Sequence, residues 1–290
     1  MSRYSLPFFR IGFAAILVAA CGLLPAPAAA PVSQPLTATF SPAPSLTASP
    51  AFTPVPTATF TARPPTETPT PTLTLRPQPK RVLILSIDGL RPDAISLAPM
   101  YNLLALMKTG AYTLVAQTTF PSSTLPAHAS LLLGTCPSQT GVDWNDYDPE
   151  KGYAQGTSVL ALAKQAGLKT VMIVGKKKLR QLTPPETTDT YLFINDRDTV
   201  IADQAAPILK EGFDLAFIHF ALVDGMGHVY GWLSPEQLSV ARRADAALAT
   251  LLTALDEAGL RQDTLVIVTA DHGGHDQTHG TRRPEDMTIP

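Results

Sequence analysis

The chain of 290 residues has only two cysteines, Cys21 and Cys136, and they lie 115 positions apart. So few cysteines exclude a small fold held together by several disulfide bonds. The chain also lacks an excess of charge, because 22 basic and 24 acidic residues give a net charge of −2. Its longest basic run is Lys176–Lys178, so we expect no nucleic-acid-binding surface.

The N-terminal region lacks an apolar run long enough to cross a membrane. Ile11–Ala20 is only ten residues long, whereas a bilayer core of about 30 Å requires roughly 20 residues. Such a run after a basic start is typical of a cleavable export signal.

The residues Leu-Val-Ala-Ala directly before Cys21 resemble a bacterial lipobox. This resemblance implies a diacylglycerol group on the cysteine sulfur and a mature protein that begins at Cys21. Ordinary cleavage near Ala30, with Cys21 discarded, is the alternative. We therefore predict a lipoprotein-type signal peptide at residues 1–20. We also expect an exported protein of the cell envelope, anchored through Cys21 to the outer face of the membrane.

Glycine is absent between Pro25 and Pro79, where 15 of the 28 prolines lie. Repeated Pro-Thr and Thr-Pro units cannot form a helix or a central strand, because proline lacks the N–H donor and fixes φ. The segment has too few large apolar side chains to offset the entropy of ordering. We predict that residues 21–80 form a disordered tether with polyproline II character.

Residues 81–290 have the pattern of a folded domain. Four continuous apolar runs suit strands buried on both faces, and they are Arg81–Ile87, Lys169–Gly175, Leu215–Ala221 and Thr264–Ala270. Helical periodicity lies between them and is clearest at Ser234–Gly259. The alternation predicts an α/β fold, with a mostly parallel sheet sandwiched between helices. Ligands in such folds bind where strands end and loops begin.

Acidic and histidine side chains follow three of these four predicted strands. They are Asp88, Asp224, His228, Asp271, His272, His275 and His279. Oxygen and nitrogen ligands without thiolates suit Zn²⁺, with Mn²⁺ as the next choice. A lone Asp-His pair is more often a structural hydrogen bond. Three acidic strand ends with histidines at short offsets favour a metal centre instead.

Thr124 lies where a helix is expected to begin, in the segment Phe120–His128. The backbone N–H groups and the dipole at a helix start favour anions. Taken alone, the hydroxyl would be a simple N-cap. Beside metal half-sites it becomes a candidate nucleophile, because a metal ion on its oxygen would help to remove the proton.

Together, these segments resemble the alkaline phosphatase superfamily, and more closely its type I phosphodiesterase/nucleotide pyrophosphatase branch. The matching motifs, in order, are Ile-Asp-Gly-Leu-Arg-Pro-Asp, Phe-Pro-Ser-Ser-Thr-Leu-Pro-Ala-His, Asp224-x-x-x-His228 and Asp271-His272-Gly-Gly. The resemblance covers about residues 81–290. It implies an alkaline-phosphatase-like fold and a metal-dependent hydrolase of phosphate esters that forms a phosphothreonine on Thr124. The expected partner is a small phosphate ester or nucleotide-like substrate.

The resemblance also implies a ligand set for two Zn²⁺ ions. The ligands of the first ion would be Asp88, Thr124, Asp271 and His272. The ligands of the second ion would be Asp224, His228 and one further histidine. We expect His279 in this place, since His275 is only three residues from His272 and can point to solvent from the turn.

Further residues around the substrate are implied in the same way. Gly141–Asn145 resembles the segment whose asparagine binds a phosphoryl oxygen, so Asn145 is an oxyanion candidate. Lys176 and Lys178 resemble substrate-contacting lysines of the phosphonate-cleaving relatives. A solvated basic turn is the alternative for both lysines.

Other branches and functions fit less well. Sulfatases need a cysteine or serine nucleophile before a Pro-x-Arg pattern, which Thr124-Leu-Pro-Ala-His128 replaces. The cofactor-independent mutases of the superfamily contain a large inserted second domain. The stretch between Asn145 and Asp224 is too short to hold it. A phosphomonoesterase and a non-catalytic envelope lipoprotein remain as alternatives. The last residue is Pro290, whereas relatives usually continue with another strand and helix, so a C-terminally shortened domain is expected.

Overall fold

The structure is a computed structural model of the chain, and it describes residues 78–290. The predicted signal peptide, Cys21 and nearly all of the predicted tether lie outside the described residues. Among the described residues, no helix combines the length and apolar character that crossing a membrane requires.

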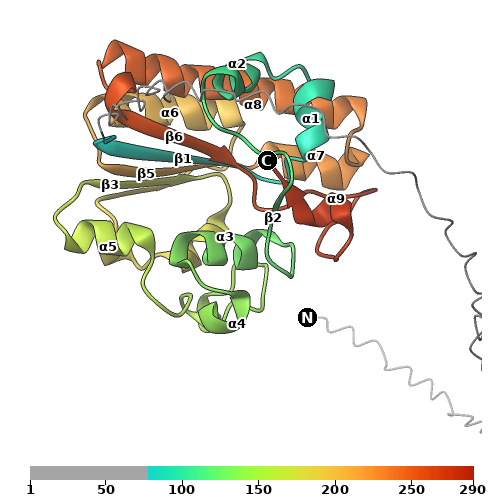
Figure 1. Cartoon of the computed structure of the whole chain (residues 1–290). Coiled ribbons are helices and arrows are strands. Elements are labelled where there is room, and N and C mark those ends of the chain that lie inside the picture. The colour runs from blue at the N-terminus through green and yellow to red at the C-terminus, as the bar shows by residue number, and fades with distance from the viewer. Residues whose placement is uncertain (1–77) are drawn as a thin grey trace, which may run out of the picture. The chain divides into compact units, whose positions relative to one another are not determined.

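A five-stranded parallel sheet lies at the centre of the described domain (Figure 1). Its strands are β1 (Arg81–Ile87), β3 (Thr170–Val174), β4 (Thr190–Phe193), β5 (Leu215–Phe220) and β6 (Thr264–Thr269). Their spatial order is β4-β3-β5-β1-β6, and every neighbouring pair is parallel. Four of these strands are the apolar runs predicted from the sequence. The predicted fold class is therefore confirmed.

Helices cover both faces of the sheet (Figure 1). One face is covered by α1 (Pro92–Leu97), α2 (Tyr101–Thr109), α6 (Asp198–Lys210), α7 (Leu222–Tyr230) and α8 (Pro235–Glu257). The other is covered by α3 (Thr124–Leu133), α4 (Pro137–Thr140) and α5 (Val159–Gln165). The remaining elements are the antiparallel pair β2 (Ala116–Gln117) and β7 (Thr288–Ile289), the helix α9 (Pro284–Met287), and 3₁₀ turns at Pro149–Lys151, Lys177–Leu182, Pro185–Thr187 and Arg261–Asp263.

Alternation along the buried strands divides the apolar interior into two clusters. In β1, Leu83 and Leu85 belong to the cluster under α6 and α8, whereas Val82 and Ile84 pack against the cluster under α3 and α5. Period-two alternation sends successive side chains to opposite faces, so a strand with helices on both sides must be apolar throughout. This arrangement explains the unbroken apolar runs of the inner strands β1, β3 and β5. The prediction of burial on both faces is wrong for β6, which lies at the edge of the sheet and exposes Leu265 and Ile267.

The longest helix, α8, begins and ends at the signals in its sequence. The Ser234 side chain accepts a hydrogen bond from the Gln237 backbone N–H at its start. At its end, Gly259 follows the C-cap in the left-handed region with φ +68°. The helix predicted from the spacing of apolar residues is thus confirmed.

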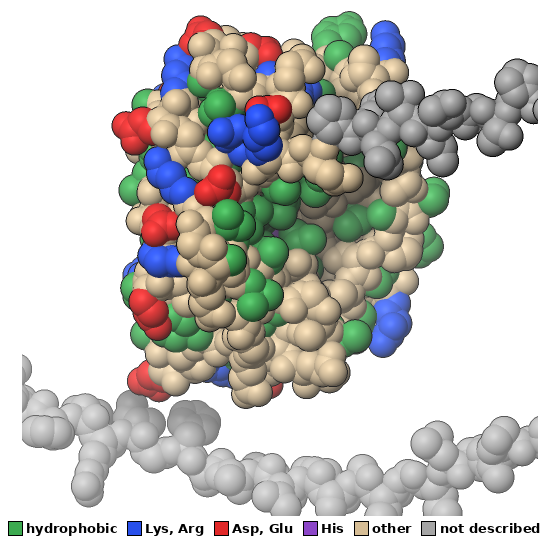
Figure 2. Space-filling view, turned by 60° about the vertical axis from the view of Figure 1, so that its left-hand side comes forward, with side chains coloured by type: hydrophobic (Ala, Val, Ile, Leu, Met, Phe, Trp, Pro, Cys, Tyr) green, Lys and Arg blue, Asp and Glu red, His purple; other side chains and the backbone are tan. Residues whose placement is uncertain are grey.

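The surface of the domain carries charges of both signs. On the face shown in Figure 2, basic and acidic side chains are interspersed, and hydrophobic side chains line a hollow in its middle. No patch of one sign extends over that face, in keeping with the nearly balanced composition.

Candidate metal centre and nucleophile

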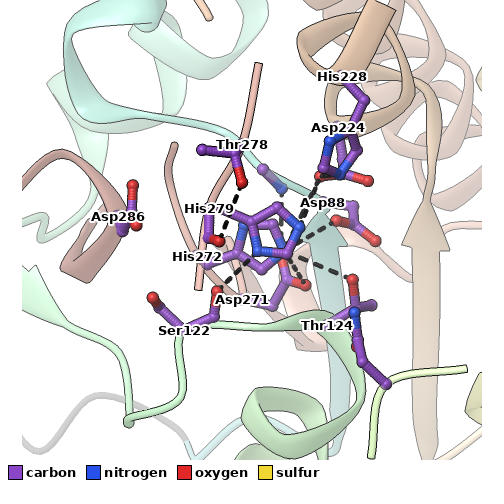
Figure 3. A network of polar contacts seen from close by, with 12 residues as sticks. Asp88, Ser122, Thr124, Asp224, His228, Asp271, His272, Thr278, His279 and Asp286 are labelled. Carbon is purple, nitrogen blue, oxygen red and sulfur yellow. Dashed lines mark hydrogen bonds and ion pairs between the residues drawn. The ribbon is translucent and has the colours of Figure 1, made fainter. Parts of the chain in front are cut away.

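The carboxyl ends of neighbouring strands bring three acidic residues together (Figure 3). Asp88 directly follows β1, and Asp271 follows β6 after one residue. Asp224 lies in α7, which begins just beyond the end of β5. Because β5, β1 and β6 are adjacent in the sheet, these chain-distant residues meet at one edge.

Gly89 allows the close approach of these elements. Its φ is +71°, and a Cβ added there would lie only 2.9 Å from Cβ of Asp224. The Gly89 backbone N–H also donates to Oδ1 of Asp271 at 3.1 Å. Only a glycine at position 89 therefore lets Asp88 come this close to Asp224 and Asp271.

Each carboxylate keeps one buried oxygen that has no hydrogen-bond partner within the described part of the chain. These atoms are Asp88 Oδ1, Asp224 Oδ1 and Asp271 Oδ2. All three face Nε2 of His272, at 3.4, 3.9 and 3.3 Å respectively. Leaving buried oxygens without partners is costly, so their convergence points to a cation at this place.

Three histidines aim lone pairs at the same oxygens. The Nδ1 atoms of His272, His228 and His279 lie 2.7, 3.0 and 2.9 Å from the carbonyl oxygens of Gly273, Gln277 and Ser122. A carbonyl only accepts, so each Nδ1 carries the proton, and in the neutral ring Nε2 holds the free lone pair. Imidazole lone pairs that face carboxylate oxygens are stable only with a positive charge between them.

His228 and His279 approach the outer side of Asp224. The Nε2 atoms of the two rings lie 3.4 and 3.6 Å from Oδ1 of Asp224. His228 follows Asp224 by four residues on α7, so both point from the same face of the helix. Burial and the neighbouring His272 lower the pKa of His279 to about 4. The ring of His279 is therefore neutral and able to bind a metal.

Two groups with the geometry of a metal site result. Asp88, Asp224 and His272 form the inner group, and Asp224, His228 and His279 form the outer group; within each group the ligand atoms lie within 4.8 Å of one another. Carboxylate oxygens with imidazole nitrogens suit Zn²⁺ or Mn²⁺. The sequence-based assignment gave Asp224 to one ion, whereas in the structure Asp224 belongs to both groups.

Lys176 lies among the carboxylates. Its Nζ is 2.7 Å from Oδ2 of Asp88 and 2.6 Å from Oδ2 of Asp224. Burial lowers the pKa of this ammonium, but the carboxylates of Asp88, Asp224 and Asp271 outweigh burial and hold it above its ordinary value. Burial likewise raises the pKa of Asp88, but Lys176 and the nearby histidines hold it well below its usual range. These groups are consequently charged at neutral pH.

Thr124 is the first residue of α3 and is fully buried. The N-cap position belongs to Ser123, so the Thr124 hydroxyl has no capping role. Its Oγ1 accepts a hydrogen bond from Lys176 Nζ at 3.3 Å and lies 3.4 Å from Nε2 of His272. The hydroxyl therefore faces the inner group from the positive end of a helix.

Asn145 lies beside the nucleophile candidate. Its side-chain Oδ1 accepts a hydrogen bond from the backbone N–H of Leu125 at 2.9 Å. This bond fixes the amide at the start of α3 and leaves the NH₂ group as its donor. The position fits the predicted contact with a phosphoryl oxygen.

A cavity of about 350 Å³ opens next to Lys176. It is lined by Asp146, Tyr147, Gly175, Lys176, Lys177, Lys178, Phe193 and Asn195. Lys178 is half-buried there, and burial together with the neighbouring Lys176 lowers its pKa. Lys177 instead lies over the ring of Tyr147, 4.3 Å from its centre. The basic segment Lys176–Lys178 thus forms part of the wall of this cavity.

His275 points away from both metal groups. Its Nδ1 lies 2.6 Å from Oδ1 of the fully buried Asp286. The other oxygen of Asp286 accepts hydrogen bonds from the backbone and the hydroxyl of Thr281. His275 and Thr281 flank His279 in the chain, so Asp286 holds the loop that carries His279.

Sequence reasoning assigned no role to two fully buried histidines of this region, His128 and His219. His128 lies 2.8 Å from both the Ser86 hydroxyl and the Thr124 carbonyl oxygen, so it ties α3 to β1. His219 contacts Asp88. For His219, the sequence offered one signal: a histidine inside an otherwise apolar strand, where an unpaired polar ring would be costly.

Comparison with known proteins gives a family match over most of the chain. Residues 82–284 match the family described as Type I phosphodiesterase / nucleotide pyrophosphatase. An uncharacterized pyrophosphatase/phosphodiesterase of Schizosaccharomyces pombe is 23% identical over 218 residues, which are 66% of this chain and 44% of that protein. Human ectonucleotide pyrophosphatase/phosphodiesterase family member 5 is 26% identical over 222 residues, which are 68% and 46% respectively. The chain spans about half the length of these relatives.

Solved structures share the fold. Murine ectonucleotide pyrophosphatase/phosphodiesterase 5 superposes with a TM-score of 0.57 at 24% identity, over 67% of this chain and 57% of that one. Phosphonoacetate hydrolase from Sinorhizobium meliloti superposes with a TM-score of 0.52 at 21% identity, over 68% and 57%. The likeness confirms the alkaline-phosphatase-like architecture predicted from the motifs.

Proposed function

Because the chain belongs to the type I phosphodiesterase/nucleotide pyrophosphatase family, we propose that it is a zinc-dependent hydrolase of phosphate esters with Thr124 as nucleophile. The observation that carries this proposal is the position of Thr124 Oγ1, 3.3 Å from Lys176 Nζ and 3.4 Å from His272 Nε2, at the start of α3. A hydroxyl beside a cationic donor and unpaired metal-type ligands is placed to act as a nucleophile.

The donors present fit two Zn²⁺ ions, with Mn²⁺ as the alternative. Asp88, Thr124, Asp271 and His272 would hold the first ion, and Asp224, His228 and His279 the second. When bound, such ions lower the pKa of a coordinated hydroxyl and polarise a phosphoryl oxygen.

In the proposed reaction, the Thr124 hydroxyl loses its proton to solvent and Oγ1 attacks phosphorus in line with the leaving oxygen, which takes up a proton from water as it departs. The Oγ–P bond forms as the bond from phosphorus to the leaving group breaks, which gives a phosphothreonine. Lys176 and the N-terminus of α3 stabilise the negative charge on Oγ1. The NH₂ group of Asn145 donates to a phosphoryl oxygen. Water then attacks phosphorus and releases Thr124.

The cavity beside Lys176 supports a substrate with a sizeable second ester group. Its aromatic walls, Tyr147 and Phe193, can contact a flat ring, while Lys176 and Lys178 can contact negatively charged oxygens. A mouse relative with this fold was solved in complex with AMP, which supports a nucleotide-like substrate. We therefore favour a diester or pyrophosphate over a simple monoester.

Release of p-nitrophenol from bis-(p-nitrophenyl) phosphate and from p-nitrophenyl phosphate, with and without zinc, tests the proposal. We expect zinc-dependent turnover with a higher kcat/KM on the diester. Thr124→Ala should remove nearly all turnover while zinc still binds, and Thr124→Ser should keep part of the rate. Turnover of Thr124→Ala within about tenfold of wild type, roughly 1.4 kcal/mol in barrier, would show that Thr124 is not the nucleophile. A zinc-loaded protein inactive on both substrates would favour the non-catalytic alternative.

We also propose that the enzyme is exported and anchored through a lipid on Cys21. The support is the lipobox-like sequence before Cys21 and the proline-rich segment that follows. The mature protein should partition with membranes, and Cys21→Ala should yield a soluble or uncleaved form. Recovery of the unmodified protein free in the medium, cut near Ala30, would contradict lipid anchoring.

A further inference from the structure

His219 lies at the meeting point of three strands beneath the metal centre. It belongs to β5, and its partners in register are Ser86 on β1 and Val174 on β3. The side chain is completely buried. A buried imidazole without partners would destabilise the fold, so both of its nitrogens must be accounted for.

The hydrogen bonds of His219 fix which nitrogen carries the proton. The backbone N–H of Gly175 donates to the His219 carbonyl oxygen at 3.2 Å and also points at Nδ1 of the ring over 3.3 Å. A backbone N–H can only donate, so Nδ1 is the acceptor and Nε2 carries the hydrogen. Nε2 lies 2.9 Å from Oδ2 of Asp88 and therefore donates to that carboxylate.

This bond determines which oxygen of Asp88 remains available. Oδ2 is held by His219 and by Lys176, whereas Oδ1 has no hydrogen-bond partner among the described residues and faces His272. A carboxylate with one oxygen held cannot rotate freely about its Cβ–Cγ bond. The free oxygen is thereby kept in the inner group.

The opposite side of the ring faces the end of β3, just before Lys176. A Cβ on Gly175 would lie 2.8 Å from Cβ of Ala221 and 3.0 Å from Cδ1 of Ile201. Only a glycine brings the end of β3 close enough for its N–H to reach the ring. His219 thus joins Asp88 and the residue preceding Lys176 through one imidazole.

We propose that His219 is a positioning residue, which holds Oδ2 of Asp88 and thereby aims Oδ1 of Asp88 at the bound cation. This inference rests on the proposed metal site. Residues that hydrogen-bond to metal ligands commonly change metal affinity about 10- to 100-fold when they are replaced. His219→Leu, which removes both polar atoms, should therefore weaken zinc binding by about that factor.

Competition between the protein and a chromophoric chelator for Zn²⁺ measures the affinity directly. His219→Gln can still donate to Asp88 and should recover most of the wild-type affinity. The adjacent Ile218→Val is the matched control, because Ile218 is equally buried in β5 but apolar. Melting of each metal-free variant in excess chelator separates loss of stability from loss of metal binding.

Zinc affinity of His219→Leu equal to that of Ile218→Val would overturn the inference. So would equal losses for His219→Leu and His219→Gln, because the effect would then not depend on the donated hydrogen bond. A wild-type chain that binds no zinc would instead overturn the proposed function and this inference with it. A selective loss in His219→Leu, with His219→Gln near wild type, would support the positioning role.

Discussion

The inner and outer metal groups differ in what supports them. The inner group, Asp88, Asp224 and His272, is entirely buried. In the outer group, which shares Asp224, the side chain of His228 is 44% exposed. The inner ligands lie mainly at the ends of adjacent strands, whereas His228 comes from a helix and His279 from a loop. Sheet geometry builds the inner group, and loop packing completes the outer one.

The outer group accordingly depends on contacts that are easier to disturb. His279 is held by the Ser122 carbonyl oxygen, and His228 by the Gln277 carbonyl oxygen. The first bond joins two loops and the second joins α7 to a loop, so neither involves a strand. Local opening is favoured where few buried contacts hold a segment. We therefore expect the outer ion to exchange with solvent faster than the inner one.

The largest effect on metal content and turnover should follow a substitution that disrupts both metal groups at once. Asp224 contributes to both, so Asp224→Ala should lose both ions and reduce turnover at least as strongly as Thr124→Ala. Zinc per chain, measured by elemental analysis after gel filtration, checks this expectation. Retention of one tightly bound ion would show that the inner group does not need Asp224.

A change confined to the loop should separate the two groups. His279→Ala should lose only the outer ion, because Nε2 of His279 is the proposed third ligand there. His275→Ala should keep the full complement, since His275 contacts Asp286 instead. The same zinc measurement decides between them. Loss of one ion in His275→Ala, with none lost in His279→Ala, would show that the late histidine was assigned wrongly.

A smaller effect concerns the helix that supplies Asp224 and His228. Oδ1 of the buried Asp198 accepts hydrogen bonds from the backbone N–H groups of Ala221 and Leu222 at the start of α7, at 2.9 and 3.3 Å. Burial raises the pKa of Asp198 to about 6. The raised pKa means that this group favours folding at low pH. That contribution, roughly 3 kcal/mol, is lost as the pH rises from about 4 through 6.

Asp198→Asn should therefore raise the melting temperature at pH 8 and change it less at pH 4. The amide keeps an oxygen for the backbone of α7 but cannot ionise. Thermal melts of both proteins at the two pH values provide the measurement. Equal shifts at pH 4 and pH 8 would mean that ionisation of Asp198 does not affect stability.

The sequence allowed prediction of those site residues whose position depends on the end of a strand. Asp88 and Asp271 each follow an apolar run, and parallel strands must present such ends at one edge. The same reasoning gave no reason for Lys176 to lie between Asp88 and Asp224. That contact depends on β3 lying directly beside β5, and strand order cannot be read from apolar runs alone.

Short or exposed elements were missed for a related reason. The edge strand β4 is four residues long and only partly buried, so its pattern does not stand out from the surrounding loop. The pair β2 and β7 has two residues per strand and joins Ala116 to Ile289. Pairings this short are set by the surrounding tertiary contacts rather than by local propensity.

The order of the strands also has a consequence for biosynthesis. Within residues 78–290, β1 is the first strand to leave the ribosome, and its only neighbours in the sheet, β5 and β6, begin at Leu215 and Thr264. The backbone N–H and C=O groups along its edges therefore stay unpaired until most of the domain has been made, a topology of high contact order that folds slowly. A nascent chain in this condition is exposed to aggregation and is a natural client for chaperones. The inner group combines Asp88 with His272, so uptake of a metal ion there would report that synthesis has passed residue 272.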